Sequence, residues 1–481
     1  MTRTYKASLR QQFDEVKEEM ERLKSSGKLS AEALALMKTM IMLFEIIIAA
    51  FLEKKTKKTS RNSSIPSSQM GNETTSPKAG SKGKGREGYG QASNFREVKT
   101  KDVKSVDFCP ECSTDLGNVK PTTTETRTKI DIIFEKHVHE VTSETKSCPV
   151  CQTTTKAPFP KDMPGPLQYG AGLKSFIVNL IVAQMIPLKR CQQMIKAMIG
   201  QVLSESTIVS YVAKLGKHLA QWEVDAIEQL LKSPVVHVDE TSMRVNRKKY
   251  WVHVHTAGNI TVKMLHPKRG KAAINDNDII PKYGGIIVHD CWASYLSYDH
   301  CGHGLCGAHL LRELAFIEES NGYRWAKNMK KLLLDTCRLV SSLENKKLGD
   351  GEYASLQRRY RSALTRGSKE MPAPIECEEG QKGRVAKSEA HNLLARLQKY
   401  EAAVLLFAKE THVPFTNNQA ERELRMGKVK QKVSGCFRSE ELAKAYCRIS
   451  SYLQTMSANG VNPLVAIHRA FTGQIYVEMG E

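Results

Sequence analysis

The residues with the clearest chemical potential lie in the stretch 417–438, where acidic side chains occur within a basic, helix-like pattern. Glu421 and Glu423 are the acids, and they are surrounded by Arg422, Arg425, Lys428, Lys430, Lys432 and Arg438. A carboxylate can bind a divalent cation, and cations beside it can bind phosphate, as a metal-dependent nuclease requires. A helix of mixed charge is more often a solvated surface. The stretch is evidence for a nuclease site only if further acids elsewhere in the chain accompany it.

Two further acids each end an apolar run that is typical of a buried strand. Asp239 ends PVVHVD, and Asp290 ends GGIIVHD. Carboxylates at the ends of neighbouring strands, joined by one from a helix, can converge on two Mg²⁺ or Mn²⁺ ions about 4 Å apart. We therefore expect Asp239, Asp290 and Glu421 to be the catalytic metal ligands.

The neighbours of these acids receive simpler interpretations. Glu240 is expected to point away from Asp239, because adjacent strand residues face opposite sides of a sheet. Glu423 is expected to be solvated on another face of its helix. Asn417 and Asn418 are predicted to cap that helix. His237 and His289, which precede the two aspartates, are interpreted as sheet residues, since hard cations prefer oxygen ligands.

The elements that would position the acids follow a recognisable order. Strand patterns cover 234–239, 244–258 and 259–267, with a hairpin at Gly258-Asn259; a helix-like stretch and a fourth strand, GGIIVHD, come next. This order indicates an α/β protein with a ribonuclease-H-like core. The pattern then becomes helical, and it predicts core halves at 233–305 and 409–450, a helical insertion at 306–408 and a helical tail at 451–481.

A helical region at 158–232 precedes this core. Its last two predicted helices, PLKRCQQMIKAMIG and SESTIVSYVAKLGKHL, are joined by a short turn and resemble a helix-turn-helix. Four side chains could then face a DNA groove: Ser206, Thr207, Ser210 and Lys214. Plain helix packing is an equal alternative.

Two Cys-x-x-Cys pairs bound a β-rich segment at 106–157. Cys109 and Cys112 form the first pair, and Cys148 and Cys151 form the second. Four thiolates complete a tetrahedron without an open position, which predicts one structural Zn²⁺. A redox pair is the less favoured alternative. A further pair, Cys306 and His309, is interpreted as a structural packing pair, although a zinc site with Cys301 or His303 is an alternative.

Composition and charge restrict the class of protein. The 481 residues carry 72 Lys and Arg against 51 Asp and Glu, a net charge of +21, which favours a polyanionic partner such as nucleic acid. Twelve cysteines are too few for a disulfide scaffold. No secretory leader is recognised, and the apolar run 40–52 is too short to span a membrane. We expect a soluble cytoplasmic protein.

The N-terminal part divides into helices and a linker. Residues 1–56 are predicted to form helices. The second of them has apolar residues at heptad spacing, which predicts either coiled-coil self-association or packing on its own domain. These residues are Leu34, Met37, Ile41, Phe44, Ile48 and Phe51. Residues 57–105 are rich in Lys, Ser, Gly and Thr and predict a basic disordered linker.

Four motifs together resemble the transposases of IS66-type insertion sequences. They are HVDET (237–241), the aromatic stretch from Asp290 to Tyr295, LCGAHLLRE (305–313) and TNNQAERELR (416–425). The cysteine pairs resemble that family's zinc-binding domain, and Cys306 and His309 match a Cys-x-x-His signature. The resemblance implies a DDE-type transposase with Asp239, Asp290 and Glu421 as its metal-binding acids.

The same resemblance implies partners. These are the double-stranded DNA of element ends and target, other copies of the chain on that DNA, and accessory proteins of the same element, all at the bacterial nucleoid. Two alternatives come from other classes: a DNA-binding regulator derived from a transposase without chemistry, and a zinc hydrolase built on CGHGLCGAH.

Overall fold

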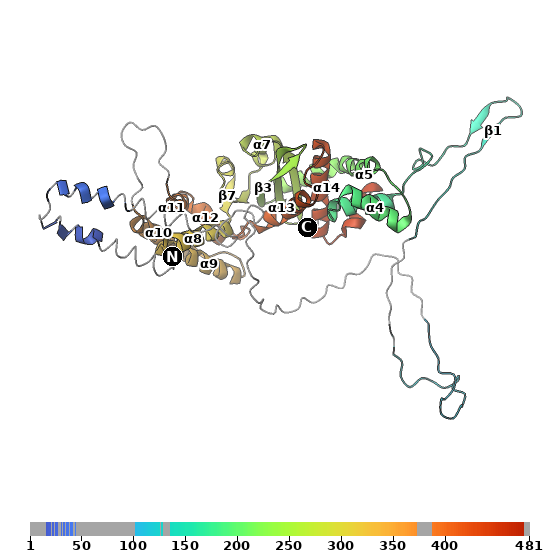
Figure 1. Ribbon diagram of the computed structural model, residues 1–481, viewed down its shortest axis with the longest axis horizontal. Coiled ribbons are helices and arrows are strands. Elements are labelled where there is room, and N and C mark those ends of the chain that lie inside the picture. The colour runs from blue at the N-terminus through green and yellow to red at the C-terminus, as the bar shows by residue number, and fades with distance from the viewer. Residues whose placement is uncertain are drawn as a thin grey trace. The chain divides into compact units, whose positions relative to one another are not determined.

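A computed structural model describes residues 102–125, 127, 135–372 and 387–475, together with scattered positions between 16 and 44. The chain forms two compact units, one of residues 71–138 and the other of residues 1–70 and 139–481. Most of residues 1–105 lies outside the described residues, including nearly all of the predicted basic linker and part of the predicted heptad seam. Figure 1 shows the elements of the described parts.

The larger unit is built on one mixed sheet of five strands (Figure 1). The strands are β3 (Val235–Val245), β4 (Lys248–Ala257), β5 (Ile260–His266), β6 (Ile286–His289) and β7 (Gly302–Leu305). Their order is β5-β4-β3-β6-β7, with β3, β4 and β5 antiparallel and with parallel pairs between β3 and β6 and between β6 and β7. The expected mixed α/β class is confirmed.

The first strand differs from its predicted length. It continues past Asp239 to Val245, and the turn to β4 falls at Asn246 and Arg247, whose φ angles are 46° and 63°. Two successive residues with positive φ make a tight hairpin, and Asn is among the residues that tolerate this conformation. Asp239 is therefore in the middle of β3, and the prediction that it ends a strand is wrong. The hairpin at Gly258-Asn259 is confirmed, because β4 ends at Ala257 and β5 begins at Ile260.

Strand β7 has no counterpart among the predicted strands. Its sequence, Gly-His-Gly-Leu, has low intrinsic β propensity. Packing selects the two glycines: a Cβ on Gly302 would stand 2.8 Å from Ile286, and one on Gly304 would stand 3.1 Å from Val413. The strand forms because it fits closely against β6, which is information that a local pattern does not contain.

Helix α14 (Glu440–Ala458) lies along the outer strand β5. The backbone N–H groups of Thr261 and Lys263 donate to the hydroxyls of Thr455 and Ser451 at 3.1 and 2.9 Å. These bonds satisfy donors that an edge strand would otherwise expose. Helix α14 therefore covers the outer edge of the sheet. It follows helix α13 (Asn418–Ser434) in the chain.

The helices before the sheet include the predicted helix pair, which corresponds to α4 (Leu188–Ile199) and α5 (Glu205–His218). The helices are α3 (Ala171–Val178), followed by a π-helical segment, α4, α5 and α6 (Ala220–Lys232). Helix α4 ends at Gly200 with φ 68°, and α5 begins at Ser204, whose hydroxyl accepts from the N–H of Thr207. A left-handed glycine after one helix and a serine cap before the next explain the turn.

The stretch between β7 and α13 is helical, as predicted. It contains α8 (Gly307–Asn321), α9 (Arg324–Ser342), α10 (Asp350–Glu370), α11 (Glu389–Lys399) and α12 (Glu401–Lys409), while residues 373–386 lie outside the described residues. These helices bury their own cluster of apolar side chains, which includes Trp325, Leu333, Tyr360 and Leu393. The same cluster includes Val288 of β6 and Leu305 of β7, so the helices pack against the sheet.

Gly307 allows the chain to enter and leave this helical stretch at one point. Its N–H donates to the carbonyl of Phe415 at 2.8 Å, and a Cβ at this position would lie 2.2 Å from the Phe415 ring. No side chain fits there without displacing the ring. The contact joins the start of α8 to the segment that leads into α13.

We predict that Gly307→Ala lowers the midpoint of thermal unfolding, because overpacking a filled site costs about 1–3 kcal/mol. Gly351→Ala is the matched control, since Gly351 lies in helix α10 and an added Cβ meets nothing within 4 Å. The control should leave the midpoint unchanged or raise it, because alanine favours a helix by up to about 1 kcal/mol over glycine. Equal behaviour of the two variants in calorimetry would contradict the close contact.

Candidate active site

The sheet register places Asp239 and Asp290 on one face. Strand β3 pairs in parallel with β6, and His237 stands opposite Val288. Two residues further along each chain are Asp239 and Asp290, so both keep the facing of that pair. The two aspartates therefore leave the carboxyl end of the parallel pair on the same side of the sheet.

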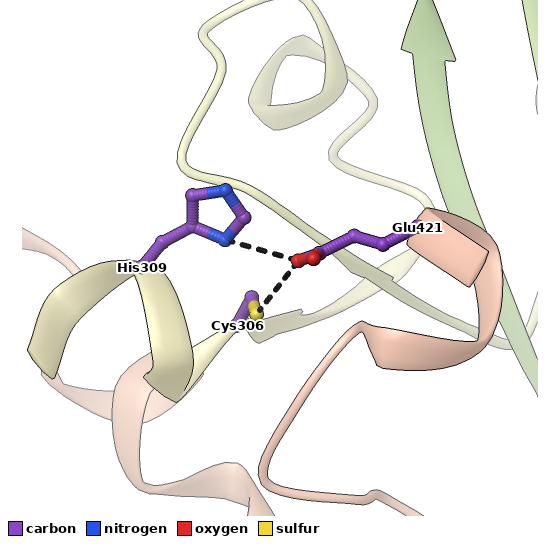
Figure 2. A group of neighbouring side chains, drawn as sticks. All are labelled: Cys306, His309 and Glu421. Atoms are coloured by element: carbon purple, nitrogen blue, oxygen red, sulfur yellow. Dashed lines mark hydrogen bonds and ion pairs between the residues drawn. The ribbon is translucent and has the colours of Figure 1, made fainter. Parts of the chain in front are cut away.

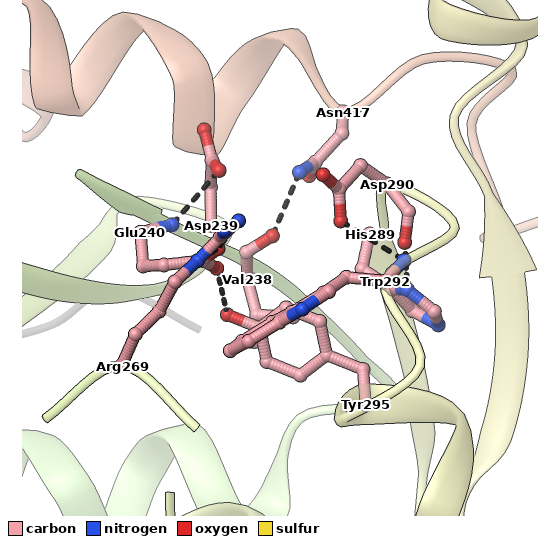
Figure 3. A network of polar contacts seen from close by, with 9 residues as sticks. All are labelled: Val238, Asp239, Glu240, Arg269, His289, Asp290, Trp292, Tyr295 and Asn417. Carbon is pink, nitrogen blue, oxygen red and sulfur yellow. Dashed lines mark hydrogen bonds and ion pairs between the residues drawn. The ribbon is translucent and has the colours of Figure 1, made fainter. Parts of the chain in front are cut away.

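Glu421 approaches this face from helix α13, which packs across β3. Figure 3 shows Asp239 directed toward that helix, with Asn417 at its start. Glu421 is in the first helical turn, and its N–H donates to the carbonyl of Asn417 at 3.2 Å. The three acids that the sequence singles out thus meet in one region, although they come from a central strand, from the end of another strand and from a helix.

Asn417 fixes where α13 begins. Its side chain is 1% exposed; Nδ2 donates to the carbonyl of Val238 at 2.8 Å, and Oδ1 lies 2.9 Å from Nδ1 of His237. Its backbone N–H donates to Sγ of Cys306 at 3.1 Å. The predicted side-chain cap by Asn417 is wrong, because this side chain is bonded to β3 and makes no cap hydrogen bond. Its position at the helix start is confirmed.

Burial acts on both aspartates, and nearby charges add to or oppose its effect. Burial raises the pKa of Asp239 well above its ordinary value, and the negative charges of Glu240, Asp290 and Glu421 raise it further. Burial also raises the pKa of Asp290, against the opposing effect of the Arg269 and Arg396 guanidinium groups. Crowded carboxylates of this kind are unfavourable unless a cation joins them. A set of hard oxygen ligands with excess negative charge fits Mg²⁺ or Mn²⁺.

The Glu240 side chain lies on the face of β3 opposite to Asp239, as predicted. Nε and Nη2 of Arg269 donate to its Oε1 at 2.8 and 2.6 Å, and the Tyr295 hydroxyl donates to Oε2 at 2.6 Å (Figure 3). The Arg269 guanidinium also stacks on the rings of Trp251 and Trp292, at 4.9 and 4.3 Å from their centroids. Glu240 is thus committed to a structural network that holds Trp292 beside Asp290.

Sequence patterns did not identify Arg269 or Arg396. Arg269 lies in a basic loop, PKRG, where it is indistinguishable from its neighbours. Arg396 comes from α11 in the helical stretch, forms an ion pair with Glu313, and lowers the pKa of Asp290. The aromatic residues that follow Asp290 could have indicated a stacking partner such as Arg269. Nothing in the sequence indicates the role of Arg396.

Cys306 and His309 lie beside Glu421 (Figure 2). Cys306 is the residue before helix α8, and His309 follows within its first turn. Oε1 of Glu421 lies 3.9 Å from Sγ of Cys306 and 3.5 Å from Nδ1 of His309. Among the described residues, these three form the group of potential metal ligands whose atoms all lie within 4.8 Å of one another, and Asp239 and Asp290 are outside it.

His237 and His289 are sheet residues, as expected. They are 7% and 0% exposed, and burial lowers the pKa of each, that of His289 to about 3. Nε2 of His289 lies 3.1 Å from Nδ1 of His303. Neutral, bonded imidazoles in these positions support the sheet.

The basic residues of α13 and of the segment that follows it differ in exposure. Exposed residues are Arg422, Arg425, Lys432 and Arg438. Lys428 donates to the carbonyl and hydroxyl of Ser242, at 2.9 and 3.3 Å. Lys430 is 8% exposed and reaches the carbonyl of Ile181 at 3.5 Å, so burial removes it from the residues that can contact DNA. The predicted solvation of Glu423 is also wrong, because its side chain is 12% exposed and pairs with Arg422.

In helix α5, the four residues proposed to face DNA differ in the same way. Ser206 and Lys214 are exposed. Thr207 and Ser210 are partly buried, and their hydroxyls bond within the helix: Thr207 to Ser204 Oγ at 2.8 Å, and Ser210 to the Thr207 carbonyl at 2.7 Å. The Ser206 hydroxyl lies 2.7 Å from Ser204 Oγ, so Ser206 is exposed but hydrogen-bonded, whereas Lys214 extends toward solvent.

The two Cys-x-x-Cys pairs form matching turns. The N–H of Cys109 donates to the carbonyl of Thr114, and that of Cys148 donates to the carbonyl of Thr153, at 2.9 and 3.0 Å. In each turn the residue after the second cysteine has φ 56°. The second turn joins the short strands β1 (Thr145–Ser147) and β2 (Thr154–Lys156). Because the pairs belong to different compact units, the four-cysteine zinc site stays a prediction.

Comparison with known proteins gives a family. The family model described as "Transposase IS66 family" matches residues 166–445, more than half of the chain. This range contains Asp239, Asp290 and Glu421, whereas the four paired cysteines lie before it. A search of curated proteins found no match. Separately, no helix in the described part of the chain is long and apolar enough to cross a membrane.

We predict that Asn417→Ala destabilises the protein, because it leaves the Val238 carbonyl without this donor and His237 without its partner. A buried polar group left unpaired costs about 1–3 kcal/mol. Asn418→Ala is the control, since Asn418 is the exposed neighbour and should change stability by less than about 0.5 kcal/mol. Chemical denaturation of both variants measures the difference; equal stabilities would show that Asn417 does not anchor α13.

We also predict a pH dependence without divalent ions. A carboxyl whose pKa is raised by folding binds its proton more tightly in the folded state, so stability falls as the pH rises from about 4 toward that raised pKa. Asp239→Asn removes the titrating group and should flatten this fall. Thermal midpoints between pH 4 and 8 in a chelating buffer measure it. A variant with an unchanged slope would mean that Asp239 carries no unfavourable charge.

Proposed function

This chain belongs to the IS66 family of transposases, and on that basis we propose that it cleaves DNA at element ends and joins the freed 3′-OH to target DNA, using Asp239, Asp290 and Glu421 to hold two Mg²⁺ or Mn²⁺ ions. The observation that carries the proposal is geometric: β3 and β6 pair in parallel with His237 opposite Val288, two residues before Asp239 and Asp290, and the helix that carries Glu421 packs across β3. A ribonuclease-H-like core is part of the same proposal, supported by the strand order β5-β4-β3-β6-β7.

Each acid has a distinct support in the chain. Asp239 is fixed by the central strand, where its Oδ1 accepts from the N–H of Glu240 at 2.8 Å. Asp290 accepts from the N–H of Trp292 at 3.2 Å. Glu421 donates its N–H to the carbonyl of Asn417, whose side chain donates to the Val238 carbonyl of β3. Bound ions of this class supply the positive charge that stabilises the attacking and leaving oxygens during phosphoryl transfer.

Cations around the acids are suited to DNA phosphates. Arg422 and Arg425 are exposed on α13, within one turn of Glu421, and Lys432 and Arg438 continue the exposed basic surface. We assign phosphate contacts to these four residues, and weaker contacts to Ser206 and Lys214 of α5. Phosphate contacts set affinity and orientation without reading sequence.

The paired cysteines are assigned to one structural Zn²⁺. Two observations support it: the turns have the same backbone geometry, and in each a threonine hydroxyl lies beside the second sulfur, 3.1 Å for Cys112 and 3.3 Å for Cys151. Hydrogen bonds, first from the Thr153 hydroxyl and then from the Thr153 backbone and Cys148, lower the pKa of Cys151 to about 7, which favours the thiolate that zinc requires. Assembly of several copies on DNA, with or without accessory proteins of the element, completes the proposal.

The experiment is strand transfer by purified protein with DNA from the ends of its own element, in Mg²⁺ or Mn²⁺. Asp290→Asn and Glu421→Gln should each reduce the rate by more than about a thousandfold, because each removes a charge on which the ions depend. Glu423→Gln is the matched control, since Glu423 is on the same helix but pairs with Arg422. It should retain activity within about tenfold.

If the wild type binds this DNA but shows no metal-dependent cleavage, and the acid variants bind equally, then the chain is a DNA-binding regulator and not an active enzyme.

A further inference from the structure

Cys306, His309 and Glu421 bring three different ligand types together at one point (Figure 2). Glu421 Oε1 is 3.9 Å from Cys306 Sγ and 3.5 Å from His309 Nδ1. With metal–ligand distances of about 2.0–2.3 Å, the ligands of a tetrahedral zinc ion lie roughly 3.3–3.8 Å from one another. The observed separations are close to this range and longer than a strong hydrogen bond.

The nitrogen of His309 supplies an independent observation. Nδ1 is buried and has no hydrogen-bond partner among the described residues, while facing the carboxylate at 3.5 Å. A buried ring nitrogen without a partner is unfavourable. A metal ion between this nitrogen, the sulfur and the carboxylate oxygen would engage all three.

Burial raises the pKa of the Cys306 thiol, and the backbone around the sulfur acts in the opposite direction. The N–H of Asn417 donates to Sγ at 3.1 Å, and the sulfur stands at the N-terminal end of α8. Amide N–H groups and the positive end of a helix both favour the charged form of sulfur. His309, three residues later, is placed on the same side of the helix, so one turn provides two ligands.

The ligand types determine the class of metal. A thiolate and an imidazole are soft or borderline ligands that favour zinc-class ions, whereas Mg²⁺ requires oxygen ligands. Among the described residues, no fourth ligand completes the group, which leaves one position for water.

We propose that Cys306, His309 and Glu421 form a binding site for a zinc-class divalent ion, and that this ion competes with the catalytic ions for Glu421. The competition rests on the proposed function, in which Glu421 is a Mg²⁺ ligand; the site itself does not. Because the same carboxylate belongs to both sets, an ion held by the thiolate and the imidazole draws it from Asp239 and Asp290. Zinc therefore inhibits an otherwise Mg²⁺-dependent enzyme.

The binding test is a Co²⁺ titration of the reduced full-length chain, because a cobalt–thiolate bond gives a near-ultraviolet absorption band and tetrahedral cobalt absorbs visible light. Wild type should bind one more Co²⁺ per chain than Cys306→Ser and His309→Ala. Cys301→Ser is the matched control: Cys301 is also buried, but its sulfur donates to the Tyr283 carbonyl at 3.0 Å. Ions bound by the paired cysteines occur in all four proteins and cancel.

Two results overturn the site. One is equal cobalt binding by wild type and Cys306→Ser; the other is a loss in Cys301→Ser as large as in Cys306→Ser. Should the variants not fold, X-ray absorption of zinc-loaded wild type decides: a second zinc with one sulfur and two or more nitrogen or oxygen ligands supports the site, and zinc bound only by sulfur contradicts it.

The competition is tested by adding Zn²⁺ to the Mg²⁺-dependent reaction. The Zn²⁺ concentration that halves the rate should rise at least about tenfold in Cys306→Ser relative to Cys301→Ser, as expected when one ligand is lost. An equal sensitivity would contradict the shared use of Glu421. If cobalt binds as predicted but no Mg²⁺-dependent activity exists, then the proposed function fails and the metal site remains.

Discussion

The burial of several carboxylates in one region is the constraint on which the proposed site depends. Burial and the charges of Glu240, Asp290 and Glu421 all raise the pKa of Asp239. Without the constraints of the fold, buried carboxylates this close together would move apart or bind protons. The parallel pairing of β3 with β6 fixes the two aspartates, and the bonds of Asn417 to β3 fix the helix that carries Glu421. The fold therefore maintains a buried arrangement of carboxylates that the proposed divalent ions would stabilise.

The two faces of β3 make different contacts. One face carries Asp239 toward α13, while the other carries Glu240 into a network with Arg269 and Tyr295. That network supports Trp292, which follows Asp290. The helical stretch that separates Asp290 from Glu421 in sequence is not a distant appendage, because Gly307 and Phe415 meet at its entry and exit and Arg396 acts on Asp290. Cys306 connects the same entry point to Glu421.

The sequence predicted the features that depend on local pattern or on residue type. The helices, the hairpin at Gly258-Asn259 and the facing of Glu240 follow from periodicity and turn chemistry. Asp239 and Asp290 were singled out because they follow apolar runs, and Glu421 because it lies in a basic, helix-like pattern. The extension of β3 through Asp239 was missed because its turn uses Asn246 and Arg247, and an arginine with positive φ is not a turn signal. Strand β7, the inward direction of Lys430 and the partners of Asn417 depend on residues far away in the chain. Local patterns contain no information about such contacts.

We propose that Asp239, Asp290 and Glu421 hold hard divalent ions between them, and anomalous X-ray diffraction from crystals grown with Mn²⁺ and element-end DNA is the decisive experiment. We expect manganese peaks within ligand distance of carboxylate oxygens from all three residues, and we expect these peaks to be lost in Asp239→Asn crystals. Manganese found only elsewhere, with the three carboxylates free of metal beside bound DNA, would contradict it.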